Sequence, residues 1–309
     1  MLMLSSHLIP GITAVTRHQE TQRIQFQQIA KTYQEVHGHV LDEIYHLLQE
    51  HYYPRLTGKT VLDIGNGGQH PKKVLGRELS SRVKYFVGLD NSGEMLERAG
   101  EAYPKVVGDG LGLPFRSKSF DYVLANGLFH HLGFTRGGDN IGRVAALLTE
   151  AARVSREGII MYEPFIPPFL ESLERLAAAV LGYMPTFMWS AGSINEAIGR
   201  SGLEKDKTLM RRFSQLTGPW YWYIVIMDYP RFKLPVMLSP IRHMFFNIVL
   251  PNSGESHPRE ERAGGERLEE FLACPVCRGE LTYGQDTIRC ERCGGVFSYR
   301  NGIPVFTTP

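Results

Sequence analysis

Cysteine is scarce in this chain and confined to one short stretch. Only four cysteines occur in 309 residues, and all of them lie between Cys274 and Cys293. A disulfide framework would distribute its cysteines through the domain, so this clustering argues against one. Two closely spaced pairs of thiols indicate instead a metal site in a protein of a reducing compartment. We therefore expect a cytoplasmic protein.

Long apolar runs and an excess of charge are also missing. No stretch reaches the roughly 18 consecutive apolar residues of a transmembrane helix. Residues 1–16 lack a basic start and are interrupted by Pro10 and Gly11, so we expect no signal peptide. The formal charge of +2 is close to balance, which lowers the expectation of strong nucleic-acid binding. Hydrophobic and charged fractions of 43% and 21% are typical of a globular protein with a core.

Short apolar runs alternate with helical patterns in the first half of the chain. Strands are expected over Lys59 to Ile64, Tyr85 to Leu89, Val106 to Val107, Phe120 to Ala125 and Gly158 to Tyr162. Helices are expected over Pro71 to Leu79, Ser92 to Gly100 and Ile141 to Val154, after one or two amphipathic helices between Arg17 and His51. This alternation predicts an α/β fold with a doubly wound, Rossmann-like parallel sheet.

The remaining chain divides into an insertion, the end of the sheet, a linker and an appendage. Residues 164–190 form an apolar insertion, and Ser193 to Ser201 is expected to be helical. Lys207 to Phe213 and Tyr221 to Met227 are expected to form an antiparallel hairpin that completes the sheet. The polar stretch 251–267 is the expected linker. It separates a domain over residues 1–250 from a small domain over residues 268–309.

The glycine-rich stretch Val61 to Gly68 follows the first strand and predicts a cradle for a nucleotide-like ligand. The dinucleotide fingerprint Gly-x-Gly-x-x-Gly fails, because its last position, counted from Gly65, is His70. A phosphate-binding loop ending in Gly-Lys-Ser/Thr is missing as well. Acidic residues at the ends of the first three strands suit a ligand with an ammonium group and ribose hydroxyls, and suit a pyrophosphate badly.

Several motifs in order resemble those of class I S-adenosylmethionine-dependent methyltransferases, especially the branch with quinone-biosynthesis and other small-molecule enzymes. The resemblance covers roughly residues 20–227. It rests on a helical signature, a glycine-rich first motif and three later motifs: Phe26, Ile29, Ala30 and Tyr33; Val61 to Gly68; Gly88 to Ala99; Gly108-Asp109 with Leu113 to Phe115 and Ser119 to Asp121; and Ala125 to Leu132. The chain departs from the family at Gln27, Gln34 and Gln69.

The resemblance implies roles for individual residues. Asp90 would bind the ribose, Asp109 the adenine amine, and Tyr33 would cover the cofactor. The full set of expected cofactor ligands is Tyr33, Asp63, Gly65, Asn66, Gly67, Asp90, Asn91, Gly108, Asp109, Gly110 and Asn126. His130 and His131 are the candidates for a general base that takes a proton from the attacking oxygen, nitrogen or carbon, although one of the pair is as well explained by a structural role.

Cys274, Cys277, Cys290 and Cys293 form two Cys-x-x-Cys pairs and predict a closed tetrahedral site for structural zinc, with iron as the alternative metal. Residues 268–309 resemble the zinc-ribbon activator subunit of several RNA and protein methyltransferases. This resemblance implies a fused stabiliser that contacts the methyltransferase domain through Ile303 to Phe306 as an edge strand. The alternative is a freestanding metal module or a nucleic-acid contact.

The acceptor is the least determined part of the function. Residues 164–190 and 219–250 favour a small apolar, amphipathic or lipid-linked acceptor, and they would contact a membrane surface if exposed. Their simpler explanation is a core and an interface between the two modules. RNA is a less favoured acceptor, by analogy with tRNA wobble-uridine enzymes that carry paired histidines and modify a carboxylate. A regulatory protein that binds S-adenosylmethionine without catalysis is the third interpretation.

Overall fold

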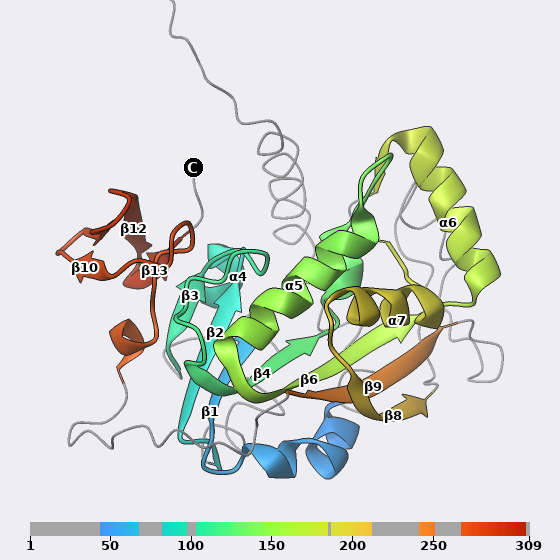
Figure 1. Cartoon of the computed structure of the whole chain (residues 1–309), viewed down its shortest axis with the longest axis horizontal. Helices are drawn as coiled ribbons and strands as arrows, with labels where there is room; N and C mark the ends of the chain where they lie inside the picture. The colour runs from blue at the N-terminus through green and yellow to red at the C-terminus, as the bar shows by residue number, and fades with distance from the viewer. Residues whose placement is uncertain are drawn as a thin grey trace, which may run out of the picture.

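The computed structural model describes residues 44–67, 82–97, 103–184, 187–211, 241–250 and 267–306. Most of the described strands join one sheet of 11 strands in the order β10-β11-β12-β13-β3-β2-β1-β4-β6-β9-β8 (Figure 1). Tyr33, the expected helix Pro71 to Leu79 and the amphipathic stretch up to residue 43 lie outside the described residues. No helix within the described ranges is long and apolar enough to cross a membrane.

The centre of the sheet is parallel, as the alternating pattern predicts. Its strands are β3 (Lys105–Val107), β2 (Tyr85–Asp90), β1 (Thr60–Ile64), β4 (Phe120–Asn126) and β6 (Ser155–Phe165). Each pairs with its neighbour in parallel register, for example Leu62 with Val87 and with Val123. Every residue of β1 is buried because helices and loops cover both faces of a central parallel strand. The predicted fold class is confirmed, with β6 longer than expected at both ends.

Helices cover the sheet, and two of them begin at a side-chain cap. Residues 44–51 are helical and lead into η1 (Tyr53–Leu56), and α4 (Gly93–Glu97) follows β2. α5 (Asn140–Val154) begins where Asp139 accepts the amide of Gly142, and α7 (Ala191–Arg200) where Ser190 accepts that of Ser193. Figure 1 shows α5 and α7 side by side in front of the sheet.

The antiparallel end of the sheet is present, but its second strand differs from the prediction. β8 (Lys205–Arg211) pairs with β9 (Arg242–Val249), which lies between β6 and β8. The expected partner, Tyr221 to Met227, lies outside the described residues. β9 fits this inner position because its six middle residues are buried and no proline removes an amide from its ladders. The prolines before residue 241 obscured this strand in the sequence.

The insertion after β6 contains a helix with an unusual distribution of side chains. α6 (Pro168–Leu181) is followed by β7 (Tyr183–Met184), which pairs with β5 (Phe134–Thr135) in a separate two-stranded sheet. Glu171 and Glu174 on α6 are buried at 4% and 1% exposure. Phe169, Leu173, Leu176, Val180 and Leu181 are more than half exposed.

The cysteine-rich segment continues the main sheet. It contains η5 (Leu268–Glu270), β10 (Leu281–Tyr283), β11 (Thr287–Cys290), β12 (Val296–Arg300) and β13 (Ile303–Val305). The expected edge strand corresponds to β13, which pairs in parallel with β3 through Val305 and Val107. The amide of Phe306 donates to the carbonyl of Val107 at 2.8 Å. Figure 1 shows this segment beside β3, at the opposite edge from β8.

Candidate cofactor and metal sites

The glycine turn after β1 has the backbone conformation that its sequence predicts. Gly65 and Gly67 have φ of 70° and 64°, a region that favours glycine. A Cβ at Gly65 would lie 2.8 Å from a methyl carbon of Leu128. The amides of Gly65 and Asn66 both donate to the carbonyl of Leu89, at 2.8 and 3.0 Å. The turn is therefore packed between β2 and the residues that follow β4.

A buried chain of hydrogen bonds starts at Asp63. The side-chain amide of Asn66 donates to Asp63 Oδ2 at 2.8 Å, and the Tyr103 hydroxyl donates to Asn66 Oδ1 at 2.7 Å. Burial is the main cause that raises the pKa of Asp63 to about 7; the Asn66 bond lowers it and nearby Asp90 raises it. A carboxyl group in this environment favours a cationic neighbour. Tyr103 was not anticipated from the sequence.

The two later acids also lie at the carboxyl ends of their strands. Asp90 accepts the amide of Gly67 and that of Ser92, each at 2.8 Å, and loss of hydration raises its pKa. It therefore holds the glycine turn and caps the start of α4, and its remaining lone pairs can accept ribose hydroxyls. Asp109 accepts the amide of Leu111 at 3.0 Å. Asn91 follows Asp90 directly in the turn before α4.

Close packing around two further glycines shapes the same edge of the sheet. A Cβ at Gly108 would lie 3.1 Å from Leu89 Cδ1, and a Cβ at Gly110 would lie 3.1 Å from Leu147 Cδ1. Both contacts are tighter than ordinary van der Waals distances. The expected ligands at the ends of β1, β2 and β3 therefore share one region, as parallel strands require.

The end of β4 offers a buried acceptor. Asn126 Oδ1 is buried and accepts no hydrogen bond from the described residues, whereas its amide nitrogen lies 3.4 Å from the Tyr53 hydroxyl. An orphaned acceptor of this kind is satisfied by a donor such as an ammonium or hydroxyl group. Together with the carboxyl groups of Asp63, Asp90 and Asp109, it matches the donor-rich, cationic character of S-adenosylmethionine.

The two candidate histidines differ in their surroundings. Both lie in η3 (Phe129–Leu132), and their ring centroids are 3.9 Å apart. His130 Nδ1 lies 2.6 Å from Glu163 Oε1 at the end of β6, and its side chain is 15% exposed. Glu163 is fully buried, and its carboxylate also accepts the amide of Leu128 and those of the first two residues of η3. Glu163 follows directly on the expected strand Gly158 to Tyr162, and nothing in the sequence signalled its contact with His130.

A tyrosine–histidine pair, Tyr162 with His243, lies near His130. The rings of Tyr162 and His243 are stacked 5.6 Å apart, and the Tyr162 hydroxyl lies 3.1 Å from His243 Nδ1. Burial, and secondarily the nearby His130, lowers the pKa of His243 to about 3. His243 is therefore neutral at physiological pH, so it adds no positive charge beside His130.

The four cysteines converge as their spacing predicts. Their sulfurs all lie within 4.8 Å of one another. The pairs Cys274–Cys293 and Cys277–Cys290 are separated by 3.7 and 3.4 Å. Sulfurs about 2.3 Å from a tetrahedral zinc ion are roughly 3.8 Å apart, so this cluster fits such an ion.

Backbone groups complete the cysteine cluster. The amides of Cys293 and Arg292 point toward the Cys290 sulfur, and that of Cys293 is the main cause that lowers the pKa of the Cys290 thiol. A Cβ at Gly279 would lie 2.7 Å from Arg292 Cβ and within 3.2 Å of two cysteine sulfurs. The first knuckle therefore requires glycine at position 279, a constraint that the cysteine spacing does not reveal.

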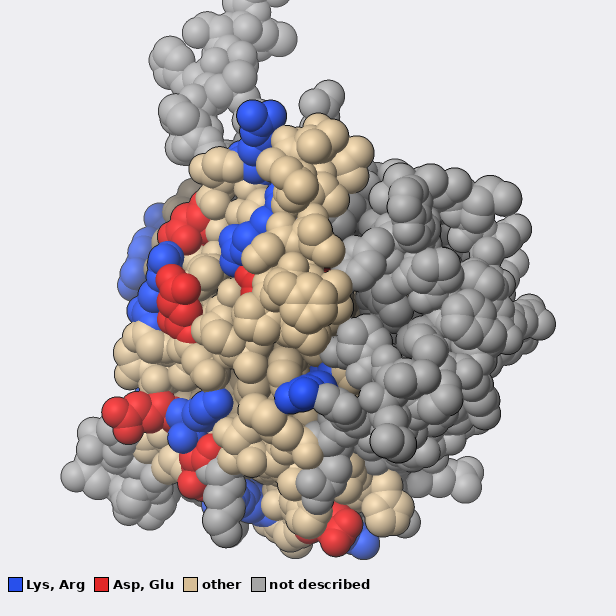
Figure 2. Space-filling view, turned by 90° about the vertical axis from the view of Figure 1, so that its right-hand side faces the viewer, with Lys and Arg blue, Asp and Glu red and all other residues tan. Residues whose placement is uncertain are grey.

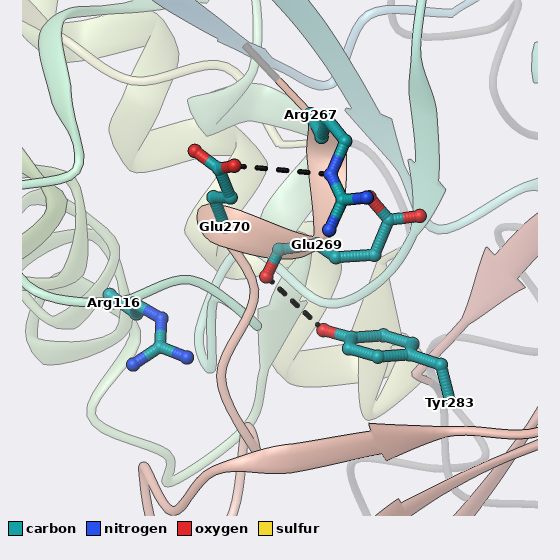
Figure 3. A pocket seen from close by; sticks show the side chains of 5 residues that line it. All are labelled: Arg116, Arg267, Glu269, Glu270 and Tyr283. Atoms are coloured by element: carbon teal, nitrogen blue, oxygen red, sulfur yellow. Dashed lines mark hydrogen bonds and ion pairs between the residues drawn. The ribbon is translucent and has the colours of Figure 1, made fainter. Parts of the chain in front are cut away.

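A hollow lies at the seam between the two modules and is separate from the strand ends. It measures about 700 Å³ and is lined by Arg116, Arg267, Glu269, Glu270 and Tyr283 (Figure 3). The Tyr283 hydroxyl donates to the Glu269 carbonyl at 3.3 Å, and Arg267 lies 3.9 Å from Glu270. Arg116 also pairs with Glu280 through two hydrogen bonds of 2.5 Å. These partners are already satisfied, so the hollow is an open seam.

The core of this fold matches a known domain. Residues 62–162 match the family model described as a methyltransferase domain. This range begins in β1, ends in β6 and includes all three acidic strand ends. The protein is an S-adenosylmethionine-dependent methyltransferase. Tyr33 of the expected cofactor set falls outside the matched range and outside the described residues.

The C-terminal segment matches a second family. A stretch of 45 residues, 14% of this chain, is 42% identical to a UPF0434 protein of Vibrio campbellii and covers 76% of it. A stretch of 41 residues is 49% identical to a UPF0434 protein of an Enterobacter species and covers 68% of it. Over this stretch the methyltransferase belongs to the UPF0434 family.

Two of the solved structures with a similar fold are described as containing a putative methyltransferase. One, from Bacillus halodurans, is 16% identical with a TM-score of 0.48, over 67% of this chain and 98% of that one. Another comes from a Haloferax volcanii complex between a methyltransferase activator and a putative methyltransferase. It is 21% identical with a TM-score of 0.45, over 68% of this chain and 92% of that one.

Proposed function

We propose that this methyltransferase modifies a small apolar or amphipathic acceptor, lipid-linked molecules included, and that its cysteine-rich module binds structural zinc and stabilises the catalytic domain. The observation that supports this class of acceptor is the exposed apolar face of α6. This helix starts shortly after the end of β6, which places it at the carboxyl edge of the sheet close to Glu163 and His130. Ligands of such sheets bind at that edge.

The charge distribution supports an apolar acceptor over RNA. Figure 2 shows the side of the molecule that lies to the right in Figure 1, where blue and red residues are interspersed among tan ones on the described surface. A single-sign basic patch, which is the footprint of nucleic-acid binding, does not gather on the described part of this face. RNA methylation of the wobble-uridine type therefore stays the second candidate. A binding protein without catalysis would not need the His130–Glu163 pair.

The catalytic roles follow from the chemistry of the donor. When bound, S-adenosylmethionine supplies a methyl group that its sulfonium sulfur has already activated. Asp90 and Asp109 would orient the nucleoside, while Asp63 and Asn126 would balance its cationic amino-acid end. The glycine turn allows the close approach, and Gly108, Gly110 and Asn91 shape the neighbouring wall. The protein mainly aligns the acceptor with the methyl group and excludes water.

The zinc module would act by covering the edge of β3. β13 occupies the hydrogen-bonding groups that an edge strand otherwise exposes. Phe271 is fully buried and stacks on Tyr85 and Phe120 at centroid distances of 5.0 and 4.9 Å. Arg300 pairs with Glu94 and Glu97, each at 2.8 Å. These contacts support an intramolecular stabiliser, with a boundary near residue 267. A closed four-thiolate site with no open coordination position suits structural zinc, and iron is the alternative metal for the same ligand set.

Contact with a membrane surface follows from the same face of α6. Its exposed positions carry no acid, because both glutamates of the helix are turned inward. An apolar helix face in the plane of a membrane would bring the site to lipid-embedded acceptors.

Isotope labelling tests the acceptor. The purified protein is incubated with an extract of its own cells and S-adenosylmethionine labelled in the methyl group, and the products are separated into lipid, RNA and protein. We expect label in the lipid or small-molecule fraction, and loss of transfer with Asp90→Ala. The variant Asp139→Asn, which changes an exposed cap and retains its acceptor, is the matched control. Label in RNA would overturn the proposed acceptor, and no label in any fraction would overturn methyl transfer itself.

A further inference from the structure

Glu163 is a fully buried carboxylate whose contacts all lie in one short segment. Its Oε2 accepts the amides of Leu128 and Phe129 at 3.0 and 3.1 Å. Its Oε1 accepts the amide of His130 at 3.1 Å and lies 2.6 Å from His130 Nδ1. Three backbone donors hold the carboxylate at the start of η3, so its position relative to the His130 ring is fixed.

This geometry determines how the His130 ring carries its proton. A carboxylate only accepts hydrogen bonds, so the contact with Glu163 requires a proton on Nδ1. In the neutral imidazole the other nitrogen, Nε2, then carries the lone pair. The arrangement is that of a base oriented by a buried acid, which also stabilises the cation formed when the base takes up a proton.

The location of η3 directs this base toward the cofactor region. η3 follows β4 after Gly127, and Leu128, at its start, packs against the glycine turn at Gly65. His130 retains 15% exposure of its side chain, whereas Glu163 has none. Of the two side chains, only that of His130 is therefore open to contact with an acceptor.

We propose that Glu163 is the positioning residue that makes His130 Nε2 the general base, and that the acceptor atom carries a proton, as a hydroxyl group does. This inference rests on the proposed methyl transfer. The acceptor O–H bond breaks as its proton moves to Nε2, and the freed oxygen pair forms the bond to the methyl carbon. The carbon–sulfur bond breaks and its electron pair returns to sulfur. The positive charge thus leaves sulfur and appears on the imidazole beside Glu163.

The same reasoning selects among acceptor classes. A carboxylate is already ionised near neutral pH and needs no base to attack a methyl group. A hydroxyl group keeps its proton at that pH and gains about 100-fold or more from a positioned base. The Glu163–His130 pair therefore favours a methyl ether product over a methyl ester, which separates this enzyme from those that modify a carboxylate on uridine.

The tautomer can be measured without knowing the acceptor. Long-range proton–nitrogen NMR on the full chain with bound S-adenosylhomocysteine reports which nitrogen of His130 is protonated. We expect Nδ1–H in the wild type. In Glu163→Gln the amide oxygen can keep the two backbone donors of Oε2, while the amide nitrogen takes the place of Oε1, gives up the His130 amide and faces Nδ1, so we expect Nε2–H. Glu157→Gln, at the other end of β6 and paired with Lys59, is the control that leaves the wild-type signal. If His130 of the wild-type protein carries its proton on Nε2, the assignment is overturned.

Transfer to a mixed apolar cell extract tests the acceptor class. Mild alkali releases methanol from methyl esters and leaves methyl ethers intact. We expect alkali-stable label, and a loss of about 100-fold in kcat for Glu163→Gln with unchanged affinity for S-adenosylhomocysteine. Alkali-labile label, or a wild-type kcat in Glu163→Gln, would overturn the inference. If the wild type transfers no label, the proposed function fails, while the NMR result still decides the role of Glu163.

Discussion

Asp63 shows how burial gives a single side chain its chemical character. The residue is 3% exposed, and burial together with Asp90 outweighs the hydrogen bond from Asn66. The neutral form is therefore stabilised relative to the charged form until a cation enters the site. S-adenosylmethionine carries a sulfonium and an ammonium group, so its binding would restore the charge on Asp63.

This change in charge predicts a proton release on cofactor binding. The pKa of Asp63 in the free protein is about 7, so a bound cation that lowers it makes the group lose a proton between about pH 5 and pH 7. Affinity should therefore increase as the pH rises through this range. Calorimetry in two buffers of different ionisation enthalpy measures the release directly. Asp63→Asn should abolish it and Asp139→Asn should not; identical enthalpies in both buffers for the wild type would contradict the prediction.

At the scale of the element, α6 distributes its polar and apolar side chains in the reverse of the way an ordinary surface helix does. Its acids face the protein and its large apolar residues face outward. Glu171 accepts the amide of Ser190 at 2.7 Å and the hydroxyl of Ser193, and thus connects α6 to the start of α7. Glu174 accepts the amide of Met188 at 2.6 Å, and its Oε1 has no partner among the described residues. Polar contacts therefore dock this helix, and its apolar face stays available.

The burial of Glu174 makes the docking of α6 depend on pH. Burial raises the pKa of Glu174 to about 8 from an ordinary 4.5. The unfolded chain loses this proton from about pH 4.5 upward while the folded protein keeps it, so stability falls as pH rises toward 8. In urea unfolding, Glu174→Gln should therefore gain stability over the wild type at pH 8 relative to pH 5, by on the order of 1 kcal/mol or more. The exposed change Glu196→Gln should show no such trend, and a parallel pH dependence of wild type and Glu174→Gln would refute the account.

At the scale of the whole molecule, two modules share one sheet and one core. Arg278, which has a positive φ of 61°, donates to the Leu113 carbonyl and pairs with Glu150 at 2.9 Å. The amide of Arg116 donates to the Phe271 carbonyl at 2.8 Å. Phe271 and the cysteines Cys274 and Cys290 belong to the same apolar cluster as β1 and β2. Metal binding and folding of the catalytic domain are therefore expected to be coupled.

Phe271 tests this coupling. Phe271→Ala removes an aromatic side chain that is fully buried between Tyr85 and Phe120, and we expect a loss of about 3–5 kcal/mol in the free energy of unfolding. The destabilisation should appear in a single transition that includes the catalytic domain. Val276→Ala changes a side chain of the same module that is 70% exposed and should have little effect. Independent unfolding of residues 267–306, with the catalytic transition unchanged, would show that the modules are uncoupled.

The sequence alone determined the central architecture and much of the candidate site. Periodicity located β1, β2, β3, β4 and α5 to within a few residues because buried parallel strands are short continuous apolar runs. Motif order predicted the methyl donor, and cysteine spacing predicted that the four thiols converge, as they do. These patterns are local, so a linear reading recovers them.

Only the tertiary structure decided which distant residues act together. It paired β8 with β9 and joined Val305 to Val107, which lie far apart in the chain. The tertiary structure brought together the hydrogen-bonded or ion-paired side chains of Glu163 and His130, Tyr103 and Asn66, and Arg278 and Glu150. It also buried the two glutamates of α6. Such contacts depend on the three-dimensional meeting of strand ends and helix faces. No periodicity or spacing within one segment encodes them.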